Sequence, residues 1–101
     1  MRELRVGLIG AGFMGKAHSM AYASMPMFFW PAPAMPVRAV IAEATEELAA
    51  EGAKRFGFES STGDWRRIIE DPTIDIVDIA TPNHLHPEMA IAAAEAGKHI
   101  I

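Results

Sequence analysis

Three glycines near the amino end of the chain have the spacing of a phosphate-binding turn. The segment Gly10-Ala11-Gly12-Phe13-Met14-Gly15 fits the pattern G-x-G-x-x-G. In this pattern the first glycine permits a tight turn, the second lets the backbone approach a diphosphate, and the third lets a helix pack closely on a strand. Amides at the start of that helix then bind phosphate oxygens. The candidate binding residues here are Gly10, Gly12, Phe13, Met14 and Gly15.

An acidic side chain stands where a second strand is expected to end. Glu43 directly follows the apolar segment Val37–Ala42, and no other acidic residue lies between Glu3 and Glu43. A carboxylate at this place accepts hydrogen bonds from a ribose diol and repels a 2′-phosphate. Glu43 therefore favours NAD over NADP, with its placement at the positive end of the next helix as the alternative explanation. Arg38 is a weaker, opposing indication of phosphate binding.

A third group of candidates follows the most apolar segment of the chain. Thr81, Pro82 and Asn83 come directly after Ile74–Ala80. In parallel sheets, ligands bind at the carboxyl ends of the strands where the strand order reverses. We therefore expect these three residues to face a cofactor.

The histidines do not suggest a metal site. His84 and His86 lie two apart in a turn, and no third ligand of suitable type is evident. His18 lies one turn after the glycine motif, where a hydrogen-bonded structural role is favoured over contact with a cofactor. His99 is expected to be structural. We therefore expect no bound metal.

The elements that must position these residues alternate between strands and helices. Apolar segments of strand length separated by segments of helical period are typical of a parallel sheet covered on both faces. Pro26 is expected to end the first helix, Thr45 to cap the second and Asp64 to cap the third. The predicted strands are Leu4–Ile9, Val37–Ala42, Phe58–Ser60, Ile74–Ala80 and Lys98–Ile101. The predicted helices are Phe13–Ser24, Thr45–Arg55, a short one carrying Trp65, Ile68 and Ile69, and Pro87–Ala96.

One segment has an unusual composition. Met25–Pro36 holds four prolines and no charge. Because it follows the first helix, right-handed crossover topology places it at the amino-end edge of the sheet. We expect an insertion whose Phe28, Phe29 and Trp30 pack on this domain or on a neighbour, with a substrate lid as the alternative.

Composition limits the classes of function. The chain has 101 residues, half of them apolar, which suits one compact domain. Nine basic against thirteen acidic residues give a net charge of −4, so neither nucleic acid nor an anionic membrane is expected as a partner. No apolar stretch reaches the roughly 20 residues that cross a bilayer. The absence of cysteine excludes disulfides and thiolate sites and fits a cytoplasmic location.

Two blocks of the sequence carry a family resemblance. The blocks are GLIGAGFMGKAHSMAY near the start and IDIVDIATPNHLHPEMAIAAAEAGKHI at the end. Together they resemble the Gfo/Idh/MocA oxidoreductases, of the glucose-fructose oxidoreductase and inositol dehydrogenase type, over essentially the whole chain. The resemblance implies a Rossmann-type doubly wound sheet of order 3-2-1-4-5 and hydride transfer between NAD(P) and a sugar, polyol or related substrate. It also implies that Thr81, Pro82, Asn83 and His86 lie along the cofactor near its nicotinamide end.

The same resemblance shows two departures. The family's usual acid at the end of the second strand aligns with Ala42, one place before Glu43. Its catalytic lysine belongs to a Glu-Lys-Pro motif expected after the strand that ends at Ile101. We therefore expect residues 1–101 to form the amino-terminal part of a dinucleotide-binding domain, truncated before completion. A substrate domain and catalytic residues would then be absent from this chain and present in its parent, an oxidoreductase.

Other interpretations remain open at this stage. The chain could be a non-catalytic nucleotide-sensing or protein-interaction module that uses the Phe28–Pro33 segment. It could also be a nucleotide fold that binds nothing and only supports assembly. Exposed apolar surface at the last strand further predicts self-association, and thus a homo-oligomer.

Overall fold

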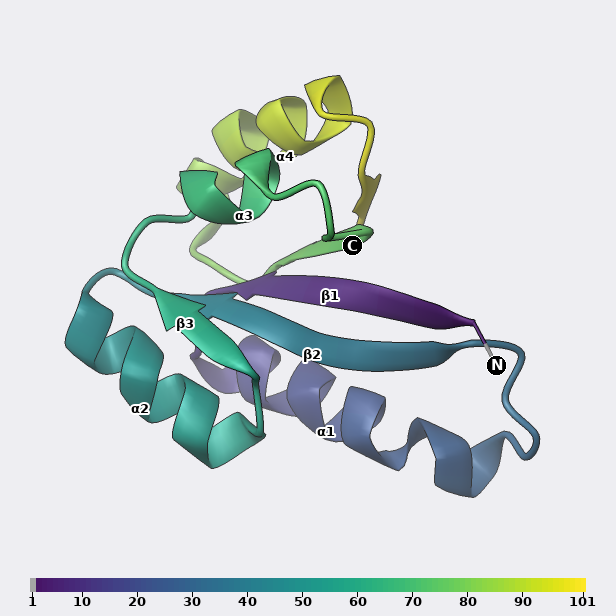
Figure 1. Ribbon diagram of the computed structural model, residues 1–101. Coiled ribbons are helices and arrows are strands. Elements are labelled where there is room, and N and C mark those ends of the chain that lie inside the picture. The colour runs from purple at the N-terminus through teal and green to yellow at the C-terminus, as the bar shows by residue number, and fades with distance from the viewer. Residues whose placement is uncertain (1) are drawn as a thin grey trace.

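The computed structural model describes residues 2–101. Its five strands form one parallel sheet in the order β3-β2-β1-β4-β5, which confirms the predicted order (Figure 1). The strands are β1 (Glu3–Ile9), β2 (Met35–Ala42), β3 (Ser60–Thr62), β4 (Ile76–Ile79) and β5 (His99–Ile100). The helices are α1 (Phe13–Phe28), α2 (Glu46–Phe56), α3 (Arg66–Glu70), the 3₁₀ turn η1 (Asn83–Leu85) and α4 (His86–Glu95).

The helices cover both faces of the sheet, as predicted. In Figure 1, α1 and α2 lie on one face, and α3 and α4 lie on the other. Each βαβ crossover is expected to be right-handed, so a reversal in the direction of strand addition puts the next helices on the opposite face. The reversal occurs between β1 and β4, and the carboxyl ends of these two strands flank the crevice of a doubly wound fold.

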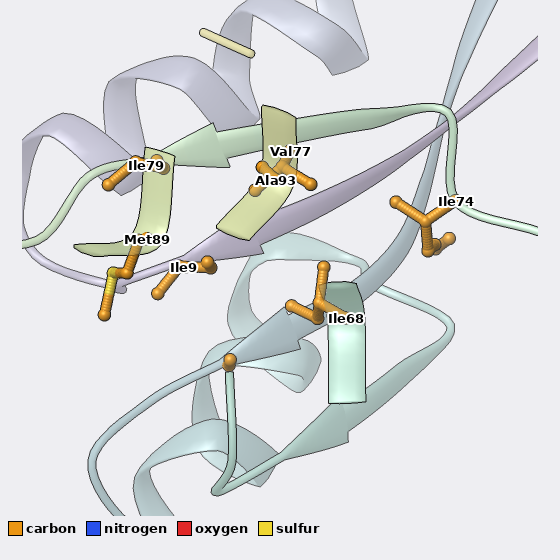
Figure 2. Close-up of a cluster of buried hydrophobic side chains, with 9 residues drawn as sticks. Ile9, Ile68, Ile74, Val77, Ile79, Met89 and Ala93 are labelled. Carbon is orange, nitrogen blue, oxygen red and sulfur yellow. The ribbon is translucent and has the colours of Figure 1, made fainter. Parts of the chain in front are cut away.

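Apolar side chains from the strands form a core on each side of the sheet. The larger cluster lies under α3 and α4, and Figure 2 shows Ile9, Val77 and Ile79 of the sheet facing Ile68 and Met89 of these helices. A smaller cluster on the α1 and α2 side joins Leu8, Ile41 and Phe58. Adjacent residues of β1 alternate between the two clusters because successive strand side chains point to opposite faces.

The ends of α2 follow the sequence expectation. The Thr45 hydroxyl accepts a hydrogen bond from the Leu48 amide at 3.1 Å, which is the expected N-cap. Gly57 ends the helix in the left-handed region with φ of 74°. Helix α3 begins at Arg66 with Trp65 as its N-cap residue, one place after the predicted cap Asp64. The Asp64 Oδ1 still accepts a hydrogen bond from the Arg66 amide, at 3.0 Å.

The prediction that Pro26 ends the first helix is wrong. Helix α1 continues through Pro26 to Phe28. A proline removes only its own N–H from the helical ladder, and it crowds the carbonyl four residues earlier. The following turn is closed by the Phe29 amide, which donates to the Met25 carbonyl at 3.0 Å. One missing bond near the end of a helix therefore did not stop it.

Strand boundaries differ from the expectation by at most two residues. Strand β3 begins at Ser60, where Phe58 was expected, because Phe58 is buried beneath α2 as part of the turn after that helix. Strand β2 begins earlier, at Met35, and includes Pro36. Proline is tolerated there because β3 pairs with β2 only from Val40 onward, so no strand needs its amide.

The Met25–Pro36 segment lies at the amino-end edge of the sheet, as predicted, where Met35 pairs with Glu3 (Figure 1). Its aromatic side chains do not pack on this domain: Phe28 is 78% exposed, Phe29 61% and Trp30 79%. That part of the prediction is wrong, because the segment turns these rings away from the sheet. A neighbouring chain as their partner stays a prediction.

Candidate functional site

The glycine motif forms the turn between β1 and α1, and the fold itself requires two of its glycines. Gly10 has φ of +103°, and a Cβ built on it would lie 2.7 Å from the Ala80 carbonyl oxygen. A Cβ on Gly15 would collide with the Gly10 carbonyl. The fold therefore requires glycine at both positions. Gly10 permits the tight turn, and Gly15 permits close packing of α1 on β1.

The fold does not require the middle glycine. Gly12 is the N-cap of α1, with ordinary φ of −76°, and a Cβ built on it meets nothing within 4 Å. Neither its backbone conformation nor its packing in this chain excludes a larger residue. A glycine with open space before it is what the close approach of a diphosphate to the backbone calls for.

The amino terminus of α1 faces this open space. The Lys16 amide makes the first helical hydrogen bond, to the Gly12 carbonyl at 2.9 Å. The amides of Phe13, Met14 and Gly15 precede it and have no helical carbonyl to bind. The side chains of Phe13 and Met14 are 83% and 53% exposed, so these two residues offer a ligand their backbone amides.

Glu43 lies beside the glycine turn. One carboxylate oxygen accepts from the Ala11 amide at 3.1 Å, and the other accepts from the Ala44 amide at 2.9 Å. The preceding Ala42 is buried and its carbonyl accepts from the Gly10 amide at 2.9 Å. Because the strand ends there, the acid one place later is the residue that reaches the glycine turn.

A cavity of about 590 Å³ opens between these elements. Its wall combines the ends of β1, β2 and β4 with the loop after β3 and the start of α4. The lining residues are Ile9, Gly10, Ala42, Glu43, Ala44, Gly63, Trp65, Thr81, Pro82, His84, Leu85, Glu88 and Met89. The volume falls within the range of small-molecule sites, about 300–1,000 Å³.

The turn after β4 contributes only part of its predicted set to this wall. Thr81 and Pro82 line the cavity. His86 does not line it: its Nε2 lies 2.6 Å from the Thr81 carbonyl oxygen, so its ring supports the turn from behind. The side chain of Asn83 lies outside the described part of the structure, although its backbone begins η1.

Trp65 forms part of the cavity wall, which the sequence analysis did not predict. The Trp65 ring, which is half-buried, lines the cavity. The Arg66 guanidinium lies 4.5 Å from the centre of that ring and pairs with the Glu88 carboxylate at 2.9 Å. The position of Trp65 in the sequence could have indicated this, because Trp65 closely follows the carboxyl end of β3, at the same sheet edge as Glu43.

Two cations that could have bound a phosphate are engaged elsewhere. Arg38 donates to the Phe56 carbonyl at 2.8 Å, so its guanidinium binds the end of α2. Lys98 donates to the carbonyls of Asp71 and Ile74 at 2.7 and 2.8 Å. Both acceptors of Lys98 precede β4, so this lysine lies at the end of the sheet opposite the crevice.

Within residues 2–101, no three His, Cys, Asp or Glu side chains gather as they would around a metal ion. Within the same range no helix has the length and apolar character needed to span a membrane.

Fold and site together define a class of protein. A parallel sheet of order 3-2-1-4-5 with a glycine turn and an acid at the end of the second strand is the arrangement of dinucleotide-binding domains. Residues 4–101 match the family described as "Oxidoreductase family, NAD-binding Rossmann fold". The chain belongs to this family of Gfo/Idh/MocA oxidoreductases, as its resemblance implied.

Individual proteins of this family are similar to the chain to different degrees. The chain is 79% identical over 101 residues to levoglucosan dehydrogenase of Pseudarthrobacter phenanthrenivorans, covering all of this chain and 26% of that protein. A solved levoglucosan dehydrogenase in complex with NADH and levoglucosan superposes with a TM-score of 0.97 at 79% identity, over 98% of this chain and 27% of the other. An NAD-binding oxidoreductase from Klebsiella pneumoniae gives 0.93 at 46% identity, over 97% and 26%. The chain thus spans about a quarter of the length of these relatives.

Proposed function

We propose that this chain is the NAD-binding part of a dehydrogenase that transfers a hydride between nicotinamide and a hydroxylated sugar. The observation that carries the proposal is the open space at Gly12, because nothing among the described residues explains a glycine there. A bound diphosphate explains it, since a side chain at this position would occupy the same space. We further propose that residues 1–101 are the amino-terminal part of the dinucleotide-binding domain.

The remaining parts of the dinucleotide fit the residues around that space. The amides of Phe13, Met14 and Gly15 would bind the diphosphate. The Glu43 carboxylate would accept hydrogen bonds from the adenosine ribose diol, and the cavity beside it would take the adenine against Trp65. Thr81 and Pro82 would line the path toward the nicotinamide. Asn83 and His86 complete the proposed set, with His86 acting through the Thr81 carbonyl.

NAD is favoured over NADP at this site. The Glu43 carboxylate is held by two amides, so a 2′-phosphate would be placed beside a fixed negative charge. Arg38, the cation that argued for a phosphate, is bound to the Phe56 carbonyl. A dehydrogenase assay is therefore expected to give a much larger kcat/KM with NAD⁺ than with NADP⁺.

The proposed substrate class comes from the relatives. The nicotinamide, when bound, supplies the acceptor or donor of the hydride. Removing the hydroxyl proton of a sugar also needs a base, and no residue of this chain is proposed for that role. The similarity to levoglucosan dehydrogenase makes levoglucosan the first substrate to test.

Two measurements test the proposal in the intact protein. NAD⁺ reduction with levoglucosan should exceed the rate with myo-inositol or without sugar, and a rate equal to the sugar-free control would reject the substrate class. For binding, NAD⁺ should change the tryptophan emission of the wild type, and Trp65→Phe should remove part of that change because Trp65 lines the cavity. Emission that stays constant through the titration, with no heat of binding, would reject the nucleotide site.

A further inference from the structure

One ionisable side chain is buried where an apolar residue would be expected. Asp78 lies in the middle of β4, in register with Leu8 of β1, and its side chain is fully buried. Parallel partners share a face, so Asp78 points to the side of the sheet that carries α1. A carboxylate without water is costly unless other groups donate to it. Something on that side must therefore satisfy Asp78.

Two side chains of α1 do so. His18 Nδ1 lies 2.9 and 2.8 Å from the two carboxylate oxygens of Asp78. The Tyr22 hydroxyl donates to one of those oxygens at 2.5 Å. The two residues are four apart and so share one face of the helix. We refer to Asp78, His18 and Tyr22 as the α1 lock. Burial, and then the hydrogen bond to Asp78, raise the pKa of the Tyr22 hydroxyl well above its ordinary value, which keeps it a donor.

The α1 lock joins the two elements that flank the proposed diphosphate site. His18 is one turn after Gly15, and the next residue, Ser19, donates to the Gly15 carbonyl at 2.7 Å. On the other side, β4 continues into Ala80, whose carbonyl abuts Gly10. The lock therefore fixes the height and rotation of α1 on β4, and with them the position of the helix amides relative to Thr81.

Stability alone does not account for these residues. Replacing a buried ionic network by apolar groups of similar volume is often neutral or stabilising. Hydrogen bonds differ from apolar contacts in having direction, so they select one placement of the helix among several that pack equally well. This difference separates a positioning role from a merely structural one.

We propose that the α1 lock positions the glycine turn for the cofactor, so that His18, Tyr22 and Asp78 determine cofactor affinity without touching the cofactor. The inference rests on the proposed NAD binding. It assigns a function to the one buried ionisable side chain among the described residues, which the proposed chemistry otherwise leaves unused.

The test compares an apolar lock with a conservative one in the intact protein. The triple variant His18→Leu, Tyr22→Phe, Asp78→Val should fold with a melting temperature near that of the wild type, but bind NADH about tenfold more weakly, since misplacement by a fraction of an ångström is enough for such a loss. His18→Leu alone should lose affinity. His18→Asn should recover most of that loss, because its amide nitrogen stands as many bonds from Cβ as Nδ1 does. Met20→Leu, on the exposed side of α1, is the matched control.

Hydrogen exchange of the cofactor-free protein separates this inference from the proposed function. The Lys16 amide, which donates to the Gly12 carbonyl, and the helix amides that follow it should exchange faster in the triple variant than in the wild type. If the wild type binds no NADH, the proposed function fails, and hydrogen exchange alone then tests whether the α1 lock positions the glycine turn. Unchanged exchange in the triple variant, or binding of NADH by that variant with wild-type affinity, would overturn the inference.

A milder variant serves if the triple variant does not fold. Tyr22→Phe keeps the side-chain volume and the Asp78–His18 pair. It should weaken NADH binding about threefold and speed exchange, and equality with wild type in both would overturn the inference.

Discussion

At the scale of single residues, the three positions of the motif hold glycine for different physical reasons. Gly10 and Gly15 are fixed by contacts inside the chain, with the carbonyls of Ala80 and Gly10. Gly12 has no such contact. A motif read from sequence treats the three positions alike, whereas the structure separates two that the fold requires from one that it does not, which we propose serves a ligand. Substitutions should therefore divide in the same way.

We expect Gly12→Ser to abolish NADH binding without loss of stability. Serine is a better N-cap than most residues and its Cβ enters empty space, so the free energy of unfolding should stay within about 0.5 kcal/mol of wild type. Denaturant unfolding and calorimetric titration measure the two effects. Gly15→Ala is the contrasting variant and should cost about 1–3 kcal/mol, because its Cβ collides with backbone. NADH binding at wild-type strength by Gly12→Ser would contradict the diphosphate site.

Tyr22 gives a pH-dependent signal of its own, because it is the only tyrosine in the chain. Its pKa is raised in the folded protein from the model-compound value of 10.0. The folded state then holds the phenolic proton more tightly than the unfolded state, so this stabilisation is complete below about pH 10 and is lost as pH rises through the folded pKa. Phenolate absorbance should appear at higher pH in the native protein than in denaturant. Coincident titrations would show that Tyr22 is not buried against Asp78.

The candidate site residues were predictable wherever local chemistry decided them. The glycine spacing located the turn, and Glu43 was identified by its place after the strand, which its bond to the Ala11 amide explains. Asp78 could not be interpreted in the same way. Its sequence context is an apolar strand, and the residues that satisfy it come from a helix 56 and 60 positions away. Only the register of β4 against β1 and α1 brings them together.

At the scale of elements, hydrophobic period and caps predicted all five strands and the main helices, while boundaries depended on tertiary contacts. Thr45 and Gly57 fixed α2 because a cap acts within a few residues. The shift of β3 to Ser60–Thr62 came from Phe58, which packs beneath α2 and so cannot also lie in the strand ladder. Propensity alone does not distinguish a buried residue in a turn from a buried residue in a strand.

Two prolines should respond in opposite ways to the same substitution. Pro26 lies inside the last turns of α1, where it removes a hydrogen bond, and Pro87 lies in the first turn of α4, where no helical bond is required of it. Pro26→Ala should raise the free energy of unfolding by about 1 kcal/mol, less than the full interior value because the helix ends soon after. Pro87→Ala should leave the free energy of unfolding unchanged or lower it. Urea unfolding of both variants checks this, and a loss of stability in Pro26→Ala would mean that its ring makes contacts worth more than the missing bond.

At the scale of the whole molecule, the two ends of the sheet differ in character. The carboxyl ends of β1, β2 and β4 meet at the cavity that carries Glu43 and Trp65. The end of α1 and the loop that leads to β2 lie at the amino end (Figure 1), and Met27, Phe28 and Trp30 of this segment are exposed apolar residues. A ligand and a protein partner would therefore approach from opposite ends and need not compete.

This separation makes the exposed aromatic residues a test of self-association. Phe28→Ser with Trp30→Ser should change the free energy of unfolding by less than about 0.5 kcal/mol, because both rings are more than three quarters exposed. Ile41→Ala, in the core, should cost about 2–5 kcal/mol by comparison. If these rings bind a second copy, light scattering should show a smaller mass for the double variant than for wild type at equal concentration. An unchanged mass would direct attention to the exposed Ile100 and Ile101 at the edge of β5. A large loss of stability would instead mean that the rings pack on their own domain.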